Sequence, residues 1–179
     1  MKNLKSWNSL PSIHSDLLKA KELVYDKCAY ECSLPIREAE SAEYAAFDFE
    51  INGLSIKFRA ARITPTKIGQ FVTLWKRESG GPIRPFDDLD LIDLFIISVR
   101  KDNFFGQFIF PKAILCHQGI VTTRNKEGKR AMRVYPSWDI TVSKQAQKTQ
   151  KWQLDYFLEI PEGEQIDLER AKRLYLDFK

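Results

Sequence analysis

The sequence has 179 residues and a formal net charge of +4, with 44% hydrophobic residues, twelve phenylalanines and three cysteines. This length and hydrophobic content exclude an intrinsically disordered chain and predict one domain with a substantial core. The cysteines are too few and too irregular for a disulfide framework, no apolar run is long enough to cross a membrane, and the N-terminus lacks the apolar core of a signal peptide. We therefore expect a reduced, cytoplasmic protein with no membrane partner.

The first elements in chain order are an arm and a helix. Residues 1–11 show no periodic pattern, so we expect an N-terminal arm followed by a single domain spanning 12–179. Ser12 is the candidate cap of a helix that runs to Tyr25, and its apolar stripe consists of Ile13, Leu17, Ala20 and Val24. The acidic stretch 36–43 is expected to form a short helical turn or a loop.

Residues 44–63 predict a β-hairpin, because Asn52-Gly53 is a type I′ turn signal between two alternating runs. A two-residue turn sets the register, and four cross-strand pairs then share one apolar face: Ile51 with Leu54, Phe49 with Ile56, Phe47 with Phe58, and Ala45 with Ala60. The same register places Asp48 opposite Lys57 on the other face. It also places Glu43 opposite Arg62, either as a salt bridge at the rim or as part of a site.

The rest of the chain predicts strands followed by helices. Strands are expected at 69–77, 94–99, 104–110 and 130–135, and helices at 112–117, at 144–160 with Ser143 as the cap, and after Asp167. The run at 94–99 is apolar on both faces, which is typical of a strand in the middle of a sheet. This order predicts an α+β fold with a central mixed, mainly antiparallel sheet flanked by helices.

The segment 56–77 concentrates one sign of charge, with six basic residues and no acid. Such clustering beside hydroxyls and a glycine favours phosphate contact, with solvated cations on a sheet surface as the alternative. Lys144, Lys148 and Lys151 form a second basic stripe on the exposed side of the helix at 144–160. Trp75 and Trp152 are candidate stacking surfaces for bases, with a core position as the alternative for Trp152. We expect nucleic acid, with DNA as the expected partner, to contact Arg59, Arg62, Thr64, Thr66, Lys67, Gln70, Lys76, Arg77, Lys148 and Lys151.

Asp48 and Glu50, with Lys57 across the hairpin, are weak candidates for a catalytic site. A metal-dependent nuclease uses clustered carboxylates to hold Mg²⁺ and a lysine near the attacked phosphate, although ordinary hairpin surfaces carry the same pairs. A nuclease or a nucleotide-hydrolysing enzyme is therefore the alternative function, and Mg²⁺ is its only implied cofactor.

Two other groups of potential metal ligands have simpler interpretations. The loop acids Asp87, Asp88 and Asp90 are expected to be solvated. Cys28, Cys32, Cys116 and His117 lack a common zinc spacing, so we expect buried thiols and no metal.

Four segments, in order, resemble those of the MepB-like proteins. They are FRAARITPTKIGQFVTLWKR at 58–77, FGQFIFPKAIL at 105–115, GKRAMRVYPSWD at 128–139 and QKTQKWQLDYF at 147–157. The resemblance implies a bacterial protein with a restriction-endonuclease-like fold and, by analogy, nucleic-acid binding through a basic patch. Nucleases of that fold carry an acid on one strand and an acid-x-Lys on the next. Here the second strand reads 58-FRAAR-62 with no carboxylate, so we expect binding without efficient cleavage.

The MepB-like family takes its name from an operon that also encodes a drug-efflux pump. This leaves a further alternative, a small-molecule-binding accessory protein in drug or stress response. An apolar pocket lined by Phe105, Tyr135 and Trp138 would favour that alternative.

Overall fold

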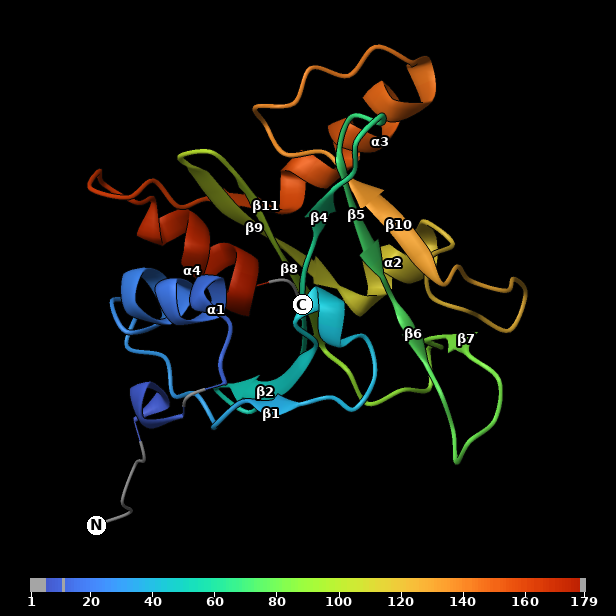
Figure 1. The fold of residues 1–179 in the computed structure, drawn as a ribbon, viewed down its shortest axis with the longest axis horizontal. Coiled ribbons are helices and arrows are strands. Elements are labelled where there is room, and N and C mark those ends of the chain that lie inside the picture. The colour runs from blue at the N-terminus through green and yellow to red at the C-terminus, as the bar shows by residue number, and fades with distance from the viewer. Residues whose placement is uncertain (1–5, 11, 178–179) are drawn as a thin grey trace.

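A six-stranded sheet with a hydrophobic core on each face organises the computed structural model, which describes residues 6–10 and 12–177 (Figure 1). Its strands, in spatial order, are β1 (Ile36–Arg37), β2 (Phe47–Ile51), β3 (Leu54–Ala60), β8 (Leu94–Lys101), β9 (Phe104–Pro111) and β11 (Phe157–Glu159). The β3 and β8 strands run parallel, and all other neighbours run antiparallel. The predicted α+β fold with a mixed, mainly antiparallel sheet is confirmed.

The central position of β8 follows from its side chains. Leu94 and Ile96 point into the first core, whereas Phe95, Ile97 and Val99 point into the second. Successive residues of a strand face opposite sides of the sheet, so a strand that is apolar throughout needs cover on both sides.

Helices cover the first face. They are α1 (Ser15–Ala20), which continues as a π-helical turn (Lys21–Tyr25), and α4 (Leu168–Leu176). The predicted stripe of Ile13, Leu17, Ala20 and Val24 is buried, although the helix begins after His14 and not at Ser12. Asp167 caps α4 by accepting from the Arg170 N–H, as predicted. None of the helices in the described ranges has the length and hydrophobicity needed to cross a bilayer.

A second, three-stranded sheet covers the other face. It consists of β10 (Ala131–Val134), β5 (Gln70–Thr73) and β4 (Arg62–Ile63). The helices α2 (Lys112–His117) and α3 (Lys144–Gln153) add side chains to the core on the same face. The inward side chains Val72, Met132 and Val134 pack into the second core beside Phe108 and Phe110. A short pair, β6 (Trp75–Lys76) with β7 (Arg84–Pro85), extends from β5.

Several predicted elements differ from the structure. The helix expected to reach residue 160 ends at Gln153, passes through a 3-10 turn (Leu154–Tyr156) and becomes β11, because Phe157 pairs with Phe108 on β9. The strand predicted at 69–77 is split between β5 and β6. The acidic stretch 36–43 holds β1 and the start of a 3-10 turn (Ala42–Tyr44), and the expected loop after residue 80 contains β7.

The hairpin turn is confirmed, with positive φ angles of 48° at Asn52 and 79° at Gly53. The predicted register holds from Ile51↔Leu54 to Phe47↔Phe58. It stops there because Ala45 adopts a left-handed conformation. Arg62 pairs with Phe71 in the second sheet, so the predicted pairing of Arg62 with Glu43, as a rim salt bridge or as part of a site, is wrong.

The expected N-terminal arm is partly attached. Its residues 1–5 and 11 lie outside the described ranges. Trp7, within a 3-10 turn (Trp7–Ser9), is buried, packs edge-on against Phe49 at 5.4 Å between ring centroids, and donates through Nε1 to the Ser33 carbonyl. This contact ties residues 7–9 to the first core.

An ion pair lies at the β1–β2–β3 side of the sheet. Arg59 is fully buried, and its Nη1 and Nη2 donate to the two carboxylate oxygens of Glu38 at 2.6 and 3.1 Å. Lys57 also contacts Glu38 at 3.3 Å and binds Asp48 at 2.9 Å. Burial opposes ionisation of Glu38, but Arg59 and Lys57 outweigh it, so the pKa of Glu38 is lowered. Burial and the Glu38 charge raise the pKa of Asp48, against the opposing effect of Lys57.

Replacing Glu38 with Ala is expected to lower the free energy of unfolding by about 3 to 5 kcal/mol, because a buried guanidinium loses its counter-ion. Since the folded pKa of Glu38 is lowered, its contribution is fully present above the ordinary glutamate pKa and is lost as pH falls through the folded value. Urea unfolding at neutral and acidic pH measures both effects. The difference between the parent and the variant should shrink in acid.

Glu169 provides the matched control, because it pairs with Lys172 on the surface of α4 at 3.0 Å. Its replacement with Ala should change the unfolding free energy by less than about 0.5 kcal/mol. Equal losses at the two positions would contradict the assigned importance of the buried pair.

Candidate functional site

Segments from three parts of the chain meet at one end of the molecule, near α3 at the top of Figure 1. Arg133 on β10 donates to the Thr64 hydroxyl at 2.8 Å and to the Gly69 carbonyl at 3.3 Å, which holds the β4–β5 loop. Gln150 on α3 donates to the carbonyls of Pro136 and Asp139 at 3.0 and 2.9 Å. We call this region the basic end and define it by its cations: Arg62, Lys67, Lys101, Arg133, Lys144, Lys148 and Lys151.

The outer face of the three-stranded sheet presents two arginines beside an aromatic ring. Arg62 on β4 and Arg133 on β10 are both register partners of Phe71 on the strand between them. Their inward neighbours fill the core, so these three side chains share the other face. The Arg133 guanidinium lies 5.7 Å from the Phe71 ring centroid. The Arg133 guanidinium is already engaged by Thr64 and Gly69, whereas that of Arg62 is exposed and suits bidentate contact with phosphate.

Within the described part of the chain, six of the seven cations of the basic end form no ion pair, and Lys101 alone contacts a carboxylate, Asp139, at 3.8 Å. Burial raises the pKa of Asp139, and Lys101 and the Gly69 N–H only partly offset this effect. Asp139 is thus the single carboxylate that pairs with a cation of the basic end among the described residues.

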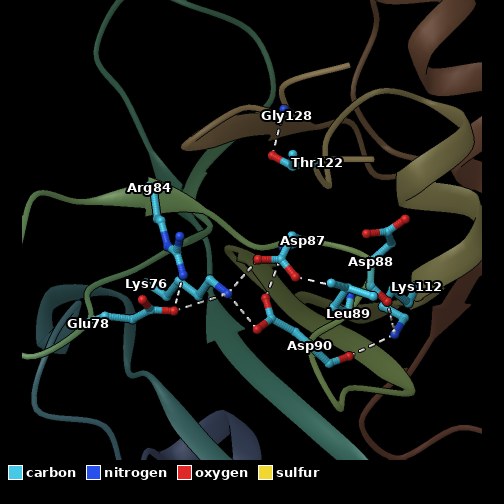
Figure 2. A network of polar contacts seen from close by, with 10 residues as sticks. All are labelled: Lys76, Glu78, Arg84, Asp87, Asp88, Leu89, Asp90, Lys112, Thr122 and Gly128. Atoms are coloured by element: carbon cyan, nitrogen blue, oxygen red, sulfur yellow. Dashed lines mark hydrogen bonds and ion pairs between the residues drawn. The ribbon is translucent and has the colours of Figure 1, made fainter. Parts of the chain in front are cut away.

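Four predicted residues already have polar partners within the protein. Arg59 is buried against Glu38, and Gln70 is 2% exposed and donates to the Arg100 carbonyl at 3.1 Å. Arg77 donates to Glu40 at 2.9 Å. Lys76 lies between two aspartates (Figure 2). The three cations were predicted from the single sign of charge in 56–77, and local sequence does not reveal their distant acidic partners.

Figure 2 shows why Lys76 is unavailable. Its Nζ lies 2.7 Å from Asp87 and 2.6 Å from Asp90, and although its partial burial opposes charging, these hydrogen bonds raise its pKa. The hydrogen bond from Lys76 in turn lowers the pKa of Asp87. Lys112 donates to the carbonyls of Asp88 and Asp90 at 2.9 and 2.7 Å. Asp87 and Asp90, predicted to be solvated, instead neutralise Lys76.

The other predicted contacts remain at the surface. Arg62, Thr66, Lys67, Lys148 and Lys151 are exposed, and Thr64 is engaged by Arg133. The predicted stacking residues are less open. Trp152 packs against Phe110 at 5.4 Å, and the Arg77 guanidinium lies 5.7 Å from the Trp75 ring centroid, so each ring already has a neighbour within the protein.

The candidate catalytic carboxylates do not converge. Asp48 is bound by Lys57, while Glu50 lines a separate cavity of about 950 Å³ beside Trp7. Glu38, which sequence reasoning missed, is the carboxylate beside Asp48. Among residues 6–10 and 12–177, no group of three or more Cys, His, Asp or Glu side chains is arranged to hold a metal. The three thiols, expected to be buried, are half-buried: Cys28 and Cys32 pack on the first core and Cys116 on the second.

Two cations of the basic end were also missed. Alternation along 131–134 already places Arg133 opposite the buried Met132 and Val134, and this signal would have found it. Lys101 ends a strand next to a turn, and nothing local marks it. The apolar pocket expected from Phe105, Tyr135 and Trp138 is not formed. Phe105 is buried in the first core, and Trp138 lines a cavity to which neither of the other two residues contributes.

Comparison with known proteins gives two matches. A family model described as MepB-like matches residues 38–159, a range that contains Glu38, Arg59 and the basic end. The crystal structure of MepB is similar to this chain, with a TM-score of 0.72 and 31% sequence identity over 85% of this chain and 99% of that one. No curated protein matches the chain.

Gly69 allows the β4–β5 loop to close against Tyr135. Its φ is +82°, and a Cβ there would lie 2.6 Å from the Tyr135 ring and 3.0 Å from the Val134 carbonyl. Replacement with Ala should therefore combine backbone strain with a steric clash and displace the loop. We expect thermal or urea unfolding to show a loss of at least roughly 2 kcal/mol.

Gly53 separates the two contributions. Its φ is +79°, but nothing lies within 4 Å of an added Cβ. Replacement of Gly53 with Ala should cost only the strain, about 1 kcal/mol. If the two variants are equally stable, the close packing of Gly69 against Tyr135 is not a constraint on the loop.

Proposed function

The chain belongs to the MepB-like family, and because that name specifies no chemistry, we propose from the charge distribution that it binds nucleic acid, with duplex DNA as the expected form. The phosphates contact the exposed cations of the basic end. A protein with this role acts where the DNA is, in the cytoplasm of a bacterial cell.

One observation carries the proposal. In the described part of the chain, six cations of the basic end form no ion pair, although this fold neutralises Arg59, Lys76 and Arg77 internally. Surplus charge of one sign on a limited surface attracts a polyanion and releases its counter-ions when the polyanion binds.

The shape of the loop supports the same function. The hairpin loop between β4 and β5 projects exposed Thr66 and Lys67, and its base is held by Arg133 and by the packing of Gly69. A loop fixed at its base presents cations and a hydroxyl with little conformational freedom left to lose on binding, which favours affinity.

The ion pairs of Glu38 and Asp48 favour nucleic-acid binding without efficient cleavage. Lys57 and Arg59 already engage the oxygens of Glu38 and Asp48. A metal ion at this position would compete with two cations already in place. The strand that carries Lys57 also supplies no carboxylate of its own.

Replacing both Arg62 and Lys67 with Gln should weaken duplex DNA binding without unfolding the protein, because both side chains are exposed. Each phosphate contact contributes about 0.9 to the slope of log K against log salt, so the slope should become shallower by about two. Fluorescence anisotropy over a range of salt concentrations, at constant pH, measures it.

The matched control is Lys172→Gln with Lys21→Gln. It removes two cations that pair with acids on the helical face, away from the basic end. Its slope should equal that of the parent. Absence of DNA binding by folded parent protein at low salt would remove the proposal altogether.

Asp139 is the carboxylate within the basic end. Its replacement with Asn should tighten DNA binding at neutral pH by roughly two- to fivefold, because one repulsive charge is lost and Lys101 is released. Because the pKa of Asp139 is raised, lowering the pH should strengthen binding by the parent more than by the variant. Anisotropy titrations at several pH values test this. An unchanged affinity at neutral pH would place the DNA away from Asp139.

A further inference from the structure

A cavity of about 420 Å³ lies at the foot of the β4–β5 loop. The loop forms one wall, and Trp138, Asp139 and Ile140, from the segment between β10 and α3, form the opposite wall. This volume falls within the range of about 300 to 1,000 Å³ that is typical of small-molecule sites. Lys67 and Lys101 are also part of its lining, and both side chains are exposed.

Two residues of the lining have polar atoms without partners. Gln70 is 98% buried; its Nε2 donates to the Arg100 carbonyl, but its Oε1 has no hydrogen bond. The Trp138 Nε1 is also buried and has no partner among the described residues. Phe104 stacks on Trp138 at 5.2 Å between ring centroids and keeps the indole in place. An unpaired buried donor or acceptor is costly, and both atoms belong to residues of this lining, so a ligand that reached and paired with both would remove that cost.

The cavity also exposes apolar side chains at its mouth. Ile63 is 57% exposed, Ile68 43% and Ile140 82%. Isolated exposed apolar residues are common, but three around one cavity are typical of a ligand site.

We propose that this cavity binds an unpaired nucleobase of the nucleic acid that the basic end holds. A nucleobase has flat apolar faces for the isoleucines and a polar edge on which donors lie beside acceptors. Its phosphates lie outside the cavity, where Lys67 and Lys101 meet them. A phosphate alone does not fit, because the Asp139 carboxylate and the isoleucines face it. An aliphatic group does not fit either, because it leaves Gln70 and Trp138 unpaired.

This inference rests on the proposed function and adds a preference to it. Moving a base out of a duplex costs its pairing and stacking energy, and that cost is lowest where the base has no partner. The protein should therefore prefer DNA with a single unpaired nucleotide to the same fully paired duplex.

The first experiment compares a duplex with the same duplex carrying one bulged nucleotide, by fluorescence anisotropy at a fixed salt concentration. We expect the bulged DNA to bind about tenfold more tightly. Equal affinities for the two DNAs would overturn the inference and leave the proposed function standing.

The second experiment removes the apolar mouth with Ile68→Ser and Ile140→Ser, both at exposed positions where folding tolerates the change. The preference for the bulge should fall below about threefold. The matched control is Ile36→Ser, on β1, which is 70% exposed and lies outside the cavity. It should keep the full preference. A preference that survives in the double variant contradicts the assignment of this cavity.

The third experiment uses nucleoside 5′-monophosphates and ribose 5-phosphate in equilibrium dialysis. Binding of the nucleotides, and at least tenfold weaker binding of ribose 5-phosphate, supports a base site. Equal binding of the two would show a phosphate site only and overturn the inference. Nucleotide binding without any binding of DNA would support the cavity and refute the proposed function. If neither nucleotides nor DNA bind, both the base site in the cavity and the proposed function are refuted.

Discussion

The ion pair between Arg59 and Glu38 is the constraint on which the distribution of charge depends. Arg59 lies in the middle of the most basic stretch of the sequence, yet it is completely buried and its counter-ion comes from beside an edge strand. Glu38 also draws in Lys57, which binds Asp48. These contacts turn part of a basic segment into a neutral core. They also occupy the carboxylates that would otherwise make this side of the sheet the natural place for a metal.

A similar neutralisation occurs at Lys76. The acids of the 87–90 loop take up this cation, and Glu40 takes up Arg77. Among the described cations that form no ion pair are those of β4, the β4–β5 loop, β10 and α3, which the three-stranded sheet and the hydrogen bonds of Arg133 and Gln150 bring together. The resulting surface combines positive charge with exposed isoleucines and a cavity, which suits an anionic polymer that also carries flat apolar rings.

Local patterns predicted much of this fold. The turn at Asn52-Gly53 determined the register of the hairpin, and the doubly apolar run at 94–99 placed β8 in the middle of the sheet. The transition from α3 to β11 was missed because Phe157 and Leu158 fit a helix pattern as well as a strand, and only pairing with β9 decides between them. Available and neutralised cations could not be told apart, because Glu38 and Arg59 are separated by 21 residues and Lys76 and Asp87 by 11, with no periodicity linking them.

We propose that the basic end of the molecule binds the nucleic acid. Chemical-shift mapping of the backbone amides with a short DNA duplex tests this claim most directly. The account predicts that the largest shifts fall in residues 62–71, 131–141 and 144–151 and fade as salt is added. Shifts confined to α1 and α4, or to the Lys76 and Arg59 clusters, would contradict it.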